Sequence, residues 1–282
     1  GFTIEDTGFE NHNLVISRIG YYSKSLTNTT KKKVLQIYLS PRPIDLDEVE
    51  IVVNRKKALK QRRNDLKKFR KLFLGNTYNA RKCTILNGEV IQLRTAENPR
   101  TLFASASEPL LIKNEALGYT VTYHLDTFVS SGASTYYTGI HFFVEDSIEK
   151  RRINEQVKAR RIKTYKGSRM HLMRAFYTQQ VENENFTVYD SLGILCAPAG
   201  EMVYRKTSHS AVLNALGPLF YTYVPESSNA NVVGSSVMRI EPGGVLITPK
   251  GYFDPDKILW SGLTGKKRVG DLLPYEYYPP VQ

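Results

Sequence analysis

Residues 119–145 read YTVTYHLDTFVSSGASTYYTGIHFFVE, and they contain the clearest two-residue alternation in the chain. The odd-numbered positions from Tyr119 to Leu125 are aromatic or aliphatic, whereas the even-numbered positions are polar. Because successive side chains of a strand point to opposite faces, this pattern predicts a strand with one buried face and one face toward solvent or a cleft. A second alternating run starts at Tyr136 after a Ser-rich turn at 130–134, which predicts a long antiparallel hairpin.

Further short strands and helices are expected on both sides of this hairpin. Upstream, strands are predicted at residues 89–94, 102–106 and 110–113. Downstream, Gly167 separates two predicted helices, one from about Ser147 to Tyr165 and one from about Ser168 to Glu182. From Phe186 onward, short strands alternate with Pro and Gly, and the chain closes with an aromatic, Pro-rich tail.

Residues 54–74 predict an amphipathic helix that ends at Gly75. Its apolar residues recur at helical spacing: Leu59, Leu66, Phe69 and Phe73. The other faces are filled by basic residues: Arg55, Lys56, Lys57, Lys60, Arg62, Arg63, Lys67, Lys68, Arg70 and Lys71. This helix is the natural boundary between the segment before it and the rest of the chain.

The segment 1–53 consists of short apolar runs separated by turn residues. Strands are expected at residues 2–4, 14–19, 21–24, 34–39 and 49–53. Spacing of this kind is typical of a small antiparallel sandwich. Pro41 and Pro43 flank the end of the fourth run, where a missing N–H disturbs a sheet least.

Composition restricts the class of protein. The chain has 282 residues and 41% hydrophobic residues, enough for a sizeable core and for two domains. No run of about twenty apolar residues occurs, so we expect any membrane association to be indirect. A formal net charge of +12 favours attraction to a polyanion, whether nucleic acid, anionic lipid or an acidic protein.

Motifs of known catalytic and metal sites are missing from the sequence. There is no GxSxG elbow, no phosphate-binding GxxxxGK[ST] loop and no GxGxxG fingerprint. The five histidines have no metal-ligand spacing, although His124 and His141 could face each other across the hairpin. Cys83 and Cys196 are expected to be buried thiols, with a disulfide as the alternative. We therefore expect no catalytic site, no metal and no cofactor.

Two rival functions stay open at this point. A hydrolase of envelope glycans or peptides would need Glu115, Asp126 and Glu145 to converge in one cleft. A nucleic-acid-binding protein would use the basic helices, but the chain lacks the motifs of an RNA-recognition domain, a zinc finger or a helix-turn-helix. No nucleic-acid partner is therefore expected.

Several blocks of the chain resemble a known family. The first 53 residues, with GFTIEDTGFENHNLVISRIGYYSKSL and QIYLSPRPIDLDEVEIVV, resemble the second half of the carboxypeptidase-regulatory-like, transthyretin-like β-sandwich of Bacteroidota envelope proteins. The blocks FRKLFLGNTYNARKCTILNGEVIQL, EPLLIKNEALGYTVTYHLDTF, KGSRMHLMRAFYTQQVENENFTVY and VGDLLPYEYYPP resemble the uncharacterised extension that follows this sandwich in a group of these proteins.

The resemblance implies a secreted protein on the periplasmic side of a bacterial outer membrane. It implies an adaptor or accessory role toward another envelope protein, without peptidase activity, since the zinc-binding HxxE pattern is absent. It also implies a sandwich that lacks its first strands. It supplies no catalytic or ligand residues.

The combined prediction is an α+β protein with mostly antiparallel sheets. It comprises an N-terminally incomplete sandwich at 1–53, a basic connecting helix at 54–75 and a Tyr-rich α+β domain with two or three helices at 76–282. We expect it to bind an outer-membrane or periplasmic protein, and in addition anionic lipid headgroups. The candidate binding residues lie on the basic helix faces: Arg62, Arg63, Lys67, Arg70, Arg160 and Arg161.

Overall fold

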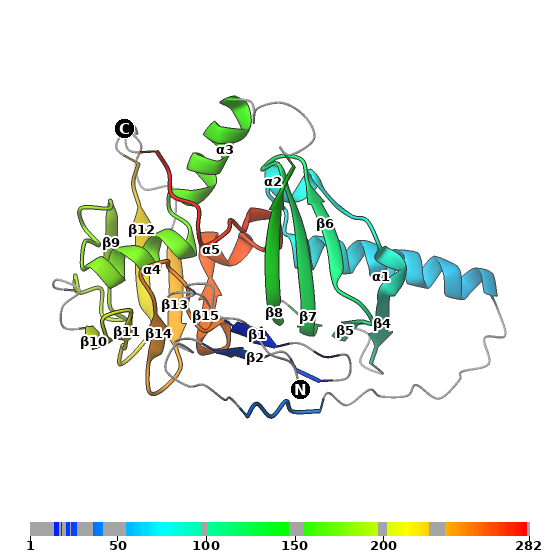
Figure 1. Cartoon of the computed structure of the whole chain (residues 1–282), viewed down its shortest axis with the longest axis horizontal. Coiled ribbons are helices and arrows are strands. Elements are labelled where there is room, and N and C mark those ends of the chain that lie inside the picture. Colours follow the sequence, from blue (N-terminus) through cyan, green and yellow to red (C-terminus); the bar gives the residue numbers. More distant parts are fainter. Residues whose placement is uncertain are drawn as a thin grey trace. The chain divides into compact units, whose positions relative to one another are not determined.

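The long hairpin is present in the computed structural model as β7 (Tyr119–Ser131) and β8 (Ser134–Glu145) (Figure 1). Tyr119, Val121, Tyr123 and Leu125 are all buried, as the alternation predicts, and the residues between them are half-buried. The structure describes residues 14–16, 18, 21–22, 24–26, 36–41, 55–96, 101–132, 134–146, 155–196, 202–225 and 235–280.

The largest sheet has the strand order β3-β6-β7-β5-β4, and β8 pairs with β7. Its other strands are short: β3 (Cys83–Ile85), β4 (Ile91–Thr95), β5 (Thr101–Ala106) and β6 (Leu110–Asn114). The strands predicted upstream of the hairpin are thereby confirmed. A 3-10 turn (Gly88–Val90) precedes β4.

Two smaller sheets follow the helices. One has the order β15-β13-β12-β9 and the other β10-β11-β14. Their strands are β9 (Phe186–Tyr189), β10 (Val203–Thr207), β11 (Ser210–Leu213), β12 (Leu219–Tyr223), β13 (Ser236–Ile240), β14 (Val245–Ile247) and β15 (Ile258–Ser261). All pairings that their registers define are antiparallel, so the α+β class is confirmed.

The described helices are α1 (Arg55–Leu74), α2 (Tyr78–Arg81), α3 (Glu155–Tyr165), α4 (Arg169–Thr178) and α5 (Gly262–Lys266), with 3-10 turns at Pro255–Lys257 and Val269–Asp271. The three predicted helices are present as α1, α3 and α4, although residues 147–154 of the second prediction lie outside the described residues; the short helices α2 and α5 were not predicted. Helix α1 ends at Gly75, whose φ of +102° lies in the left-handed region that favours glycine.

Helix α4 is shorter than the sequence predicts, ending at Thr178 rather than near Glu182. Gln179 adopts a left-handed conformation with a φ of 58°. Its N–H donates to Phe176 O, and the Gln180 N–H donates to Ala175 O at 2.8 Å. This pair of bonds closes the helix, and no glycine marks the position in the sequence.

Only part of the segment 1–53 is described. Strands β1 (Leu14–Ile16) and β2 (Lys24–Leu26) form an antiparallel pair. The predicted strand at 34–39 is wrong for residues 36–39, which have no regular secondary structure. Nearby, a single bridge joins Tyr21 to Pro41, which is too short to define a strand. The strands predicted at 2–4 and 49–53 lie outside the described residues.

The chain divides into two compact units. Unit 1 comprises residues 1–69, 85–111 and 122–142, and unit 2 comprises residues 70–84, 112–121 and 143–282. In unit 1, Phe69 of α1 packs edge-on against Phe128 of β7, with the ring centroids 4.8 Å apart. The C-terminal part of the apolar face of α1 is buried, with Phe69, Phe73 and Leu74, whereas Leu59 near the start of the helix is 60% exposed.

Unit 2 has a core built around α4. Leu172, Met173 and Phe176 of this helix are fully buried and belong to one cluster with the inward-facing residues of β9, β12 and β13. In Figure 1, α4 lies across one face of this sheet. None of the helices in the described ranges is both long and apolar enough to cross a membrane.

Candidate functional site

Helix α1 carries most of the net charge of the chain. Its 20 residues include ten Lys and Arg and one acidic residue, Asp65, so the helix contributes a charge of +9 (ten minus one) to the total of +12. The Asp65 carboxylate accepts two hydrogen bonds from the Gln61 amide at 3.0 Å. No acidic residue lies in the first turn, where a carboxylate would stabilise the helix dipole. This composition disfavours helix stability and favours a role in binding an anionic surface.

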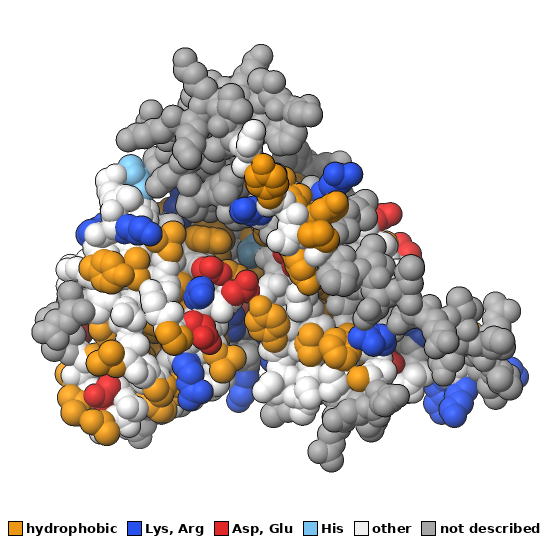
Figure 2. Space-filling view, turned by 90° about the horizontal axis from the view of Figure 1, so that it is seen from below, with side chains coloured by type: hydrophobic (Ala, Val, Ile, Leu, Met, Phe, Trp, Pro, Cys, Tyr) orange, Lys and Arg blue, Asp and Glu red, His pale blue; other side chains and the backbone are white. Residues whose placement is uncertain are grey.

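Four of these cations lie along one exposed line of the helix, which we call the α1 stripe: Lys56, Lys60, Arg63 and Lys67. Their spacing of four, three and four residues places them on the same face. At a rise of 1.5 Å per residue, the stripe is about 16 Å long. The opposite face carries the buried Phe69. Lys and Arg side chains are visible at the α1 end of the space-filling view (Figure 2).

The six residues proposed from the sequence have different environments. Arg63 and Lys67 are exposed and belong to the α1 stripe. Arg62 and Arg70 are exposed as well, but they donate to backbone carbonyls, Arg62 to Ile91 O at 3.1 Å and Arg70 to Cys83 O at 3.4 Å. Lys56 and Lys60 were not singled out by sequence reasoning. The signal that identifies them is the spacing of cations along the helix.

Arg160 and Arg161 of α3 do not form an exposed basic face. Arg161 is only 5% exposed, and its guanidinium donates to Leu117 O at 2.7 Å, Gly118 O at 3.1 Å and the Glu145 carboxylate. Arg160 donates to Ala116 O at 2.8 Å. The expectation of an exposed binding surface is therefore wrong for Arg161. Its burial is possible because every polar group it presents has a partner.

Buried polar residues also join distant sequence blocks within unit 2. The Asp271 carboxylate accepts hydrogen bonds from Thr77 Oγ1 at 2.9 Å and Asn79 Nδ2 at 2.9 Å. Burial raises the pKa of Asp271 above its usual value. The two hydrogen bonds act in the opposite direction but do not cancel this effect. The Asn114 amide donates to Gly270 O at 3.0 Å. Polar residues from three segments that are far apart in the sequence, at 77–79, 114 and 270–271, thus serve the packing of unit 2.

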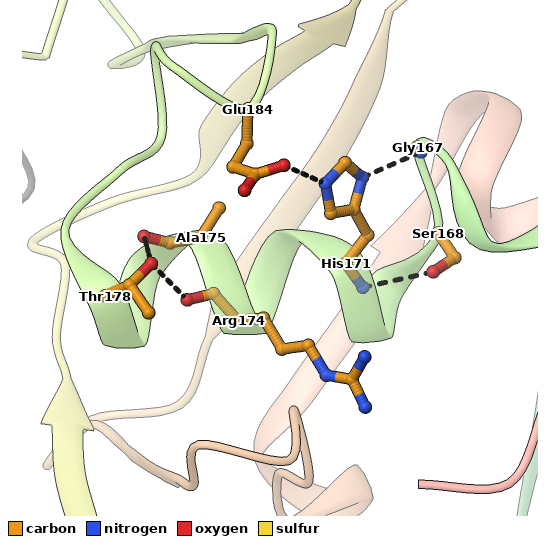
Figure 3. A network of polar contacts seen from close by, with 7 residues as sticks. All are labelled: Gly167, Ser168, His171, Arg174, Ala175, Thr178 and Glu184. Carbon is orange, nitrogen blue, oxygen red and sulfur yellow. Dashed lines mark hydrogen bonds and ion pairs between the residues drawn. The ribbon is translucent and has the colours of Figure 1, made fainter. Parts of the chain in front are cut away.

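The block KGSRMHL forms the polar start of α4 (Figure 3). The Ser168 hydroxyl caps the helix by accepting from the His171 backbone N–H at 3.1 Å. The Gly167 N–H donates to His171 Nδ1 at 3.1 Å, so the imidazole proton is on Nε2, which lies 2.8 Å from the Glu184 carboxylate. Burial lowers the pKa of His171.

This Ser, His and Glu set lacks the geometry of a catalytic triad. The Ser168 hydroxyl is bonded to the backbone of His171 and not to its ring. The ring itself lies among aromatic side chains, with the centroid of Tyr165 at 4.7 Å and that of Phe186 at 4.8 Å. The arrangement fixes the start of α4 and one tautomer of His171, which is a structural role.

The other candidates for chemistry are dispersed. His124 contacts Phe142 and His141 stacks on Tyr123, so the two histidines lie on opposite faces of the hairpin. The expectation that they face each other is wrong. Of the three carboxylates considered for a hydrolase, Glu145 pairs with Arg161 and Glu115 is exposed, while Asp126 belongs to unit 1. Among the described residues, no group of three or more His, Cys, Asp and Glu could hold a metal ion.

Both cysteines are unpaired thiols, as predicted, but the predicted burial is confirmed only for Cys83. Cys83 is buried, and burial raises its pKa to about 12, so it is present as the unreactive thiol. Cys196 is partly buried and lines a cavity of about 120 Å³ with Phe176, Val181 and Met202. Ligand pockets usually measure about 300 Å³ or more. The cavity is too small for a typical substrate.

No family model, curated protein or solved structure matches this chain.

Proposed function

We propose that this protein is a non-catalytic interaction protein and that the α1 stripe binds an acidic surface of a partner protein. The observation that carries the proposal is the concentration of charge, because one helix contributes +9 of the net charge of +12. Four exposed cations on one line fit a complementary row of carboxylates. Exposed lysines are mobile and strongly hydrated, so they act mainly through steering and charge complementarity.

A protein partner is chosen over a bilayer surface or single-stranded nucleic acid because the described part of α1 lacks the continuous exposed apolar face and the exposed aromatic side chains that those partners would use. A helix that inserts into a bilayer surface needs a continuous exposed apolar face. In the described part of α1 the only large apolar side chain that is exposed is Leu59, whereas Phe69, Phe73 and Leu74 are buried. Binding of single-stranded nucleic acid uses aromatic rings for base stacking, and the α1 stripe contains none. An acidic protein surface requires only the cations. The phosphates of a duplex would require no more, so binding of a generic duplex at low salt is the result that would favour nucleic acid instead.

The location and the adaptor role are proposed from the resemblance of the sequence blocks. On that basis the protein acts at the periplasmic side of a bacterial outer membrane, with a transthyretin-like sandwich in residues 1–53. It binds another envelope protein there, and anionic lipid headgroups near that partner are a second source of negative charge. The pairing of β1 with β2 is compatible with such a sandwich.

A pull-down from native membranes in mild detergent tests the proposal with three proteins. The first is the native chain, and the second carries Lys56→Glu, Lys60→Glu, Arg63→Glu and Lys67→Glu. The third is a control with the same change of charge at exposed lysines elsewhere: Lys113→Glu, Lys163→Glu, Lys206→Glu and Lys257→Glu. We expect the native chain and the control to recover the same acidic protein, and the α1 stripe variant to recover about tenfold less or none.

Two results would overturn the proposal. Equal recovery of the partner by the stripe variant would show that α1 is not the interface. Equal loss in the stripe variant and in the control would show that only net charge matters. Anionic vesicles offered in parallel distinguish lipid from protein, because binding to vesicles without any captured protein would assign the stripe to headgroups.

A further inference from the structure

The first half of α1, residues 55–64, concentrates charge of one sign. Its sequence, RKKALKQRRN, contains six Lys or Arg and no acidic residue. Three of the six, at 55–57, lie in the first turn, where the positive end of the helix dipole disfavours cations. Other cations lie three or four residues apart, such as Lys56, Lys60 and Arg63, and like charges at that spacing destabilise a helix. Repulsion between cations therefore opposes helix formation in this half of α1.

Little packing offsets this repulsion. Between residues 56 and 64 no side chain is buried and only Ala58 is half-buried, and the first buried residue in the described part of the helix is Phe69. Figure 1 shows this half of α1 extending past β4, the last strand in the order of the large sheet. The Arg62 guanidinium links it to that strand by donating to Ile91 O at 3.1 Å. Because helices of this length are marginal in water without a packed apolar face, the first half of α1 is poised between helix and coil.

Intrinsic propensity, in contrast, favours the helix in residues 55–64. Ala, Leu, Lys, Arg and Gln are all good helix formers, and Asn64 is the one poor helix former among these ten residues. The segment contains no Gly and no Pro. Neutralisation of the cations is therefore enough to shift the segment toward helix, and an anionic partner neutralises them by contact.

We propose that residues 55–64 form a stable helix only when an acidic polypeptide binds the α1 stripe, so that binding and helix formation are coupled. The inference rests on the proposed function, because Lys56, Lys60 and Arg63 of the stripe lie in this segment. The second half of α1, which carries the buried Phe69, is folded before the partner binds. Coupling lowers the affinity, because part of the binding free energy orders the helix. It also makes the affinity depend on helix propensity at positions outside the contact.

Hydrogen exchange of the full chain, read by mass spectrometry, tests the proposal. Poly-L-glutamate serves as the acidic polypeptide, at about 20 mM salt, where exposed charges are weakly screened. In the free chain, amides at 56–64 should exchange within about tenfold of the rate of an unfolded peptide, whereas those at 69–74 should exchange far more slowly. With poly-L-glutamate, exchange at 56–64 should slow by about tenfold or more. The α1 stripe variant should show no such change.

Two uncharged positions distinguish coupled folding from binding to a helix that is already formed. Ala58→Gly lowers helix propensity and Asn64→Ala raises it, and both variants keep every cation. If folding is coupled, the dissociation constant for poly-L-glutamate should rise by about fivefold in Ala58→Gly and fall by about twofold in Asn64→Ala. Chemical denaturation should give the native midpoint for both variants, because the segment is not folded in the free chain.

The results separate this inference from the proposed function. Slow exchange at 56–64 in the free chain would overturn the coupling and leave the proposed function intact. The same holds if poly-L-glutamate binds without slowing that exchange, or binds Ala58→Gly and the native chain equally well. Failure of the native chain to bind poly-L-glutamate at low salt, with rapid exchange at 56–64, would instead overturn the proposed function and this inference with it.

Discussion

At the scale of single residues, many polar side chains stabilise the fold by hydrogen bonds between its segments. Arg161, Arg174, His171 and Asp271 each satisfy backbone or side-chain partners from distant parts of unit 2. Of these four residues, only Arg161 was singled out from the sequence, as an exposed binding residue. A sequence gives no signal of which carbonyls lie near a guanidinium, so their structural role became visible only in the fold.

Replacement of His171 by Gln should expose this role through its pH dependence. Burial lowers the pKa of folded His171, while the unfolded chain protonates near pH 6.5. Stability is therefore unaffected above that pH and falls as the pH drops from about 6.5 toward the folded pKa. Loss of the bonds to Gly167 and Glu184 should cost about 1–3 kcal/mol at pH 8, and the variant should lose less further stability on acidification.

Thermal unfolding of both proteins between about pH 8 and pH 5 measures this difference. The stability of the variant will still decrease somewhat as the pH falls, because burial also lowers the pKa of His124 and His141. An equal dependence of stability on pH in the two proteins would contradict the assignment of a neutral, buried His171.

Gly139 of β8 provides a steric prediction. A Cβ at this position would lie 2.1 Å from His124 O and 2.6 Å from Tyr123 Cε1, so the hairpin strands could not keep their distance. Gly139→Ala should destabilise the protein by about 1–3 kcal/mol. Gly88→Ala is the matched control, because nothing lies within 4 Å of its added Cβ, and it should change stability by less than about 0.5 kcal/mol. Chemical denaturation that finds the two variants equal would refute this packing.

At the scale of elements, periodicity predicted which helices and strands exist, but it did not predict where they end. The basic helix and the hairpin occur as predicted because each has a long, regular pattern with a Gly or Ser-rich end. Helix α4 ends earlier than predicted because Gln179 adopts a left-handed conformation, which cannot be predicted from a glutamine in the sequence. The α1 stripe could have been found from cation spacing, but the burial of Arg161 depends on carbonyls about 44 residues away.

The Arg174 side chain of α4 holds the C-terminal tail. The Arg174 guanidinium donates to Lys250 O at 3.1 Å, to Tyr275 O at 2.9 Å and to Tyr277 O at 2.9 Å. It also lies 4.0 Å from the ring centroid of Tyr278. Arg174→Gln should cost about 3 kcal/mol, since it leaves three part-buried carbonyls without this donor.

The same variant should make the tail accessible to chymotrypsin at its tyrosines before the rest of the chain is cut. Limited proteolysis with mass spectrometry detects this order, and Arg63→Gln on the exposed α1 stripe is the control that should leave both stability and digestion unchanged. Simultaneous cleavage of tail and core in Arg174→Gln would indicate global unfolding. It would contradict the claim that Arg174 stabilises only the docking of the tail.

At the scale of the whole molecule, charge and apolar surface are assigned to different elements. Helix α1 concentrates positive charge, and unit 2 exposes several large apolar side chains, among them Leu192, Ile194 and Leu216. Such surfaces suit a protein whose work is binding. Net charge could be predicted from composition, but the exposure of these apolar side chains could not, because it depends on how strands and loops pack in the fold.

Photo-crosslinking in the native envelope tests the central claim, that α1 is the interface, most directly. A photoreactive amino acid replaces Arg63 on the α1 stripe in one protein and the exposed Lys206 of unit 2 in another, and the adducts are identified by mass spectrometry. We predict a discrete adduct between position 63 and an acidic envelope protein, which is absent from position 206 and lost when Lys56, Lys60 and Lys67 are changed to Glu. No adduct at position 63, or the same adducts at both positions, would contradict the proposed role of the α1 stripe.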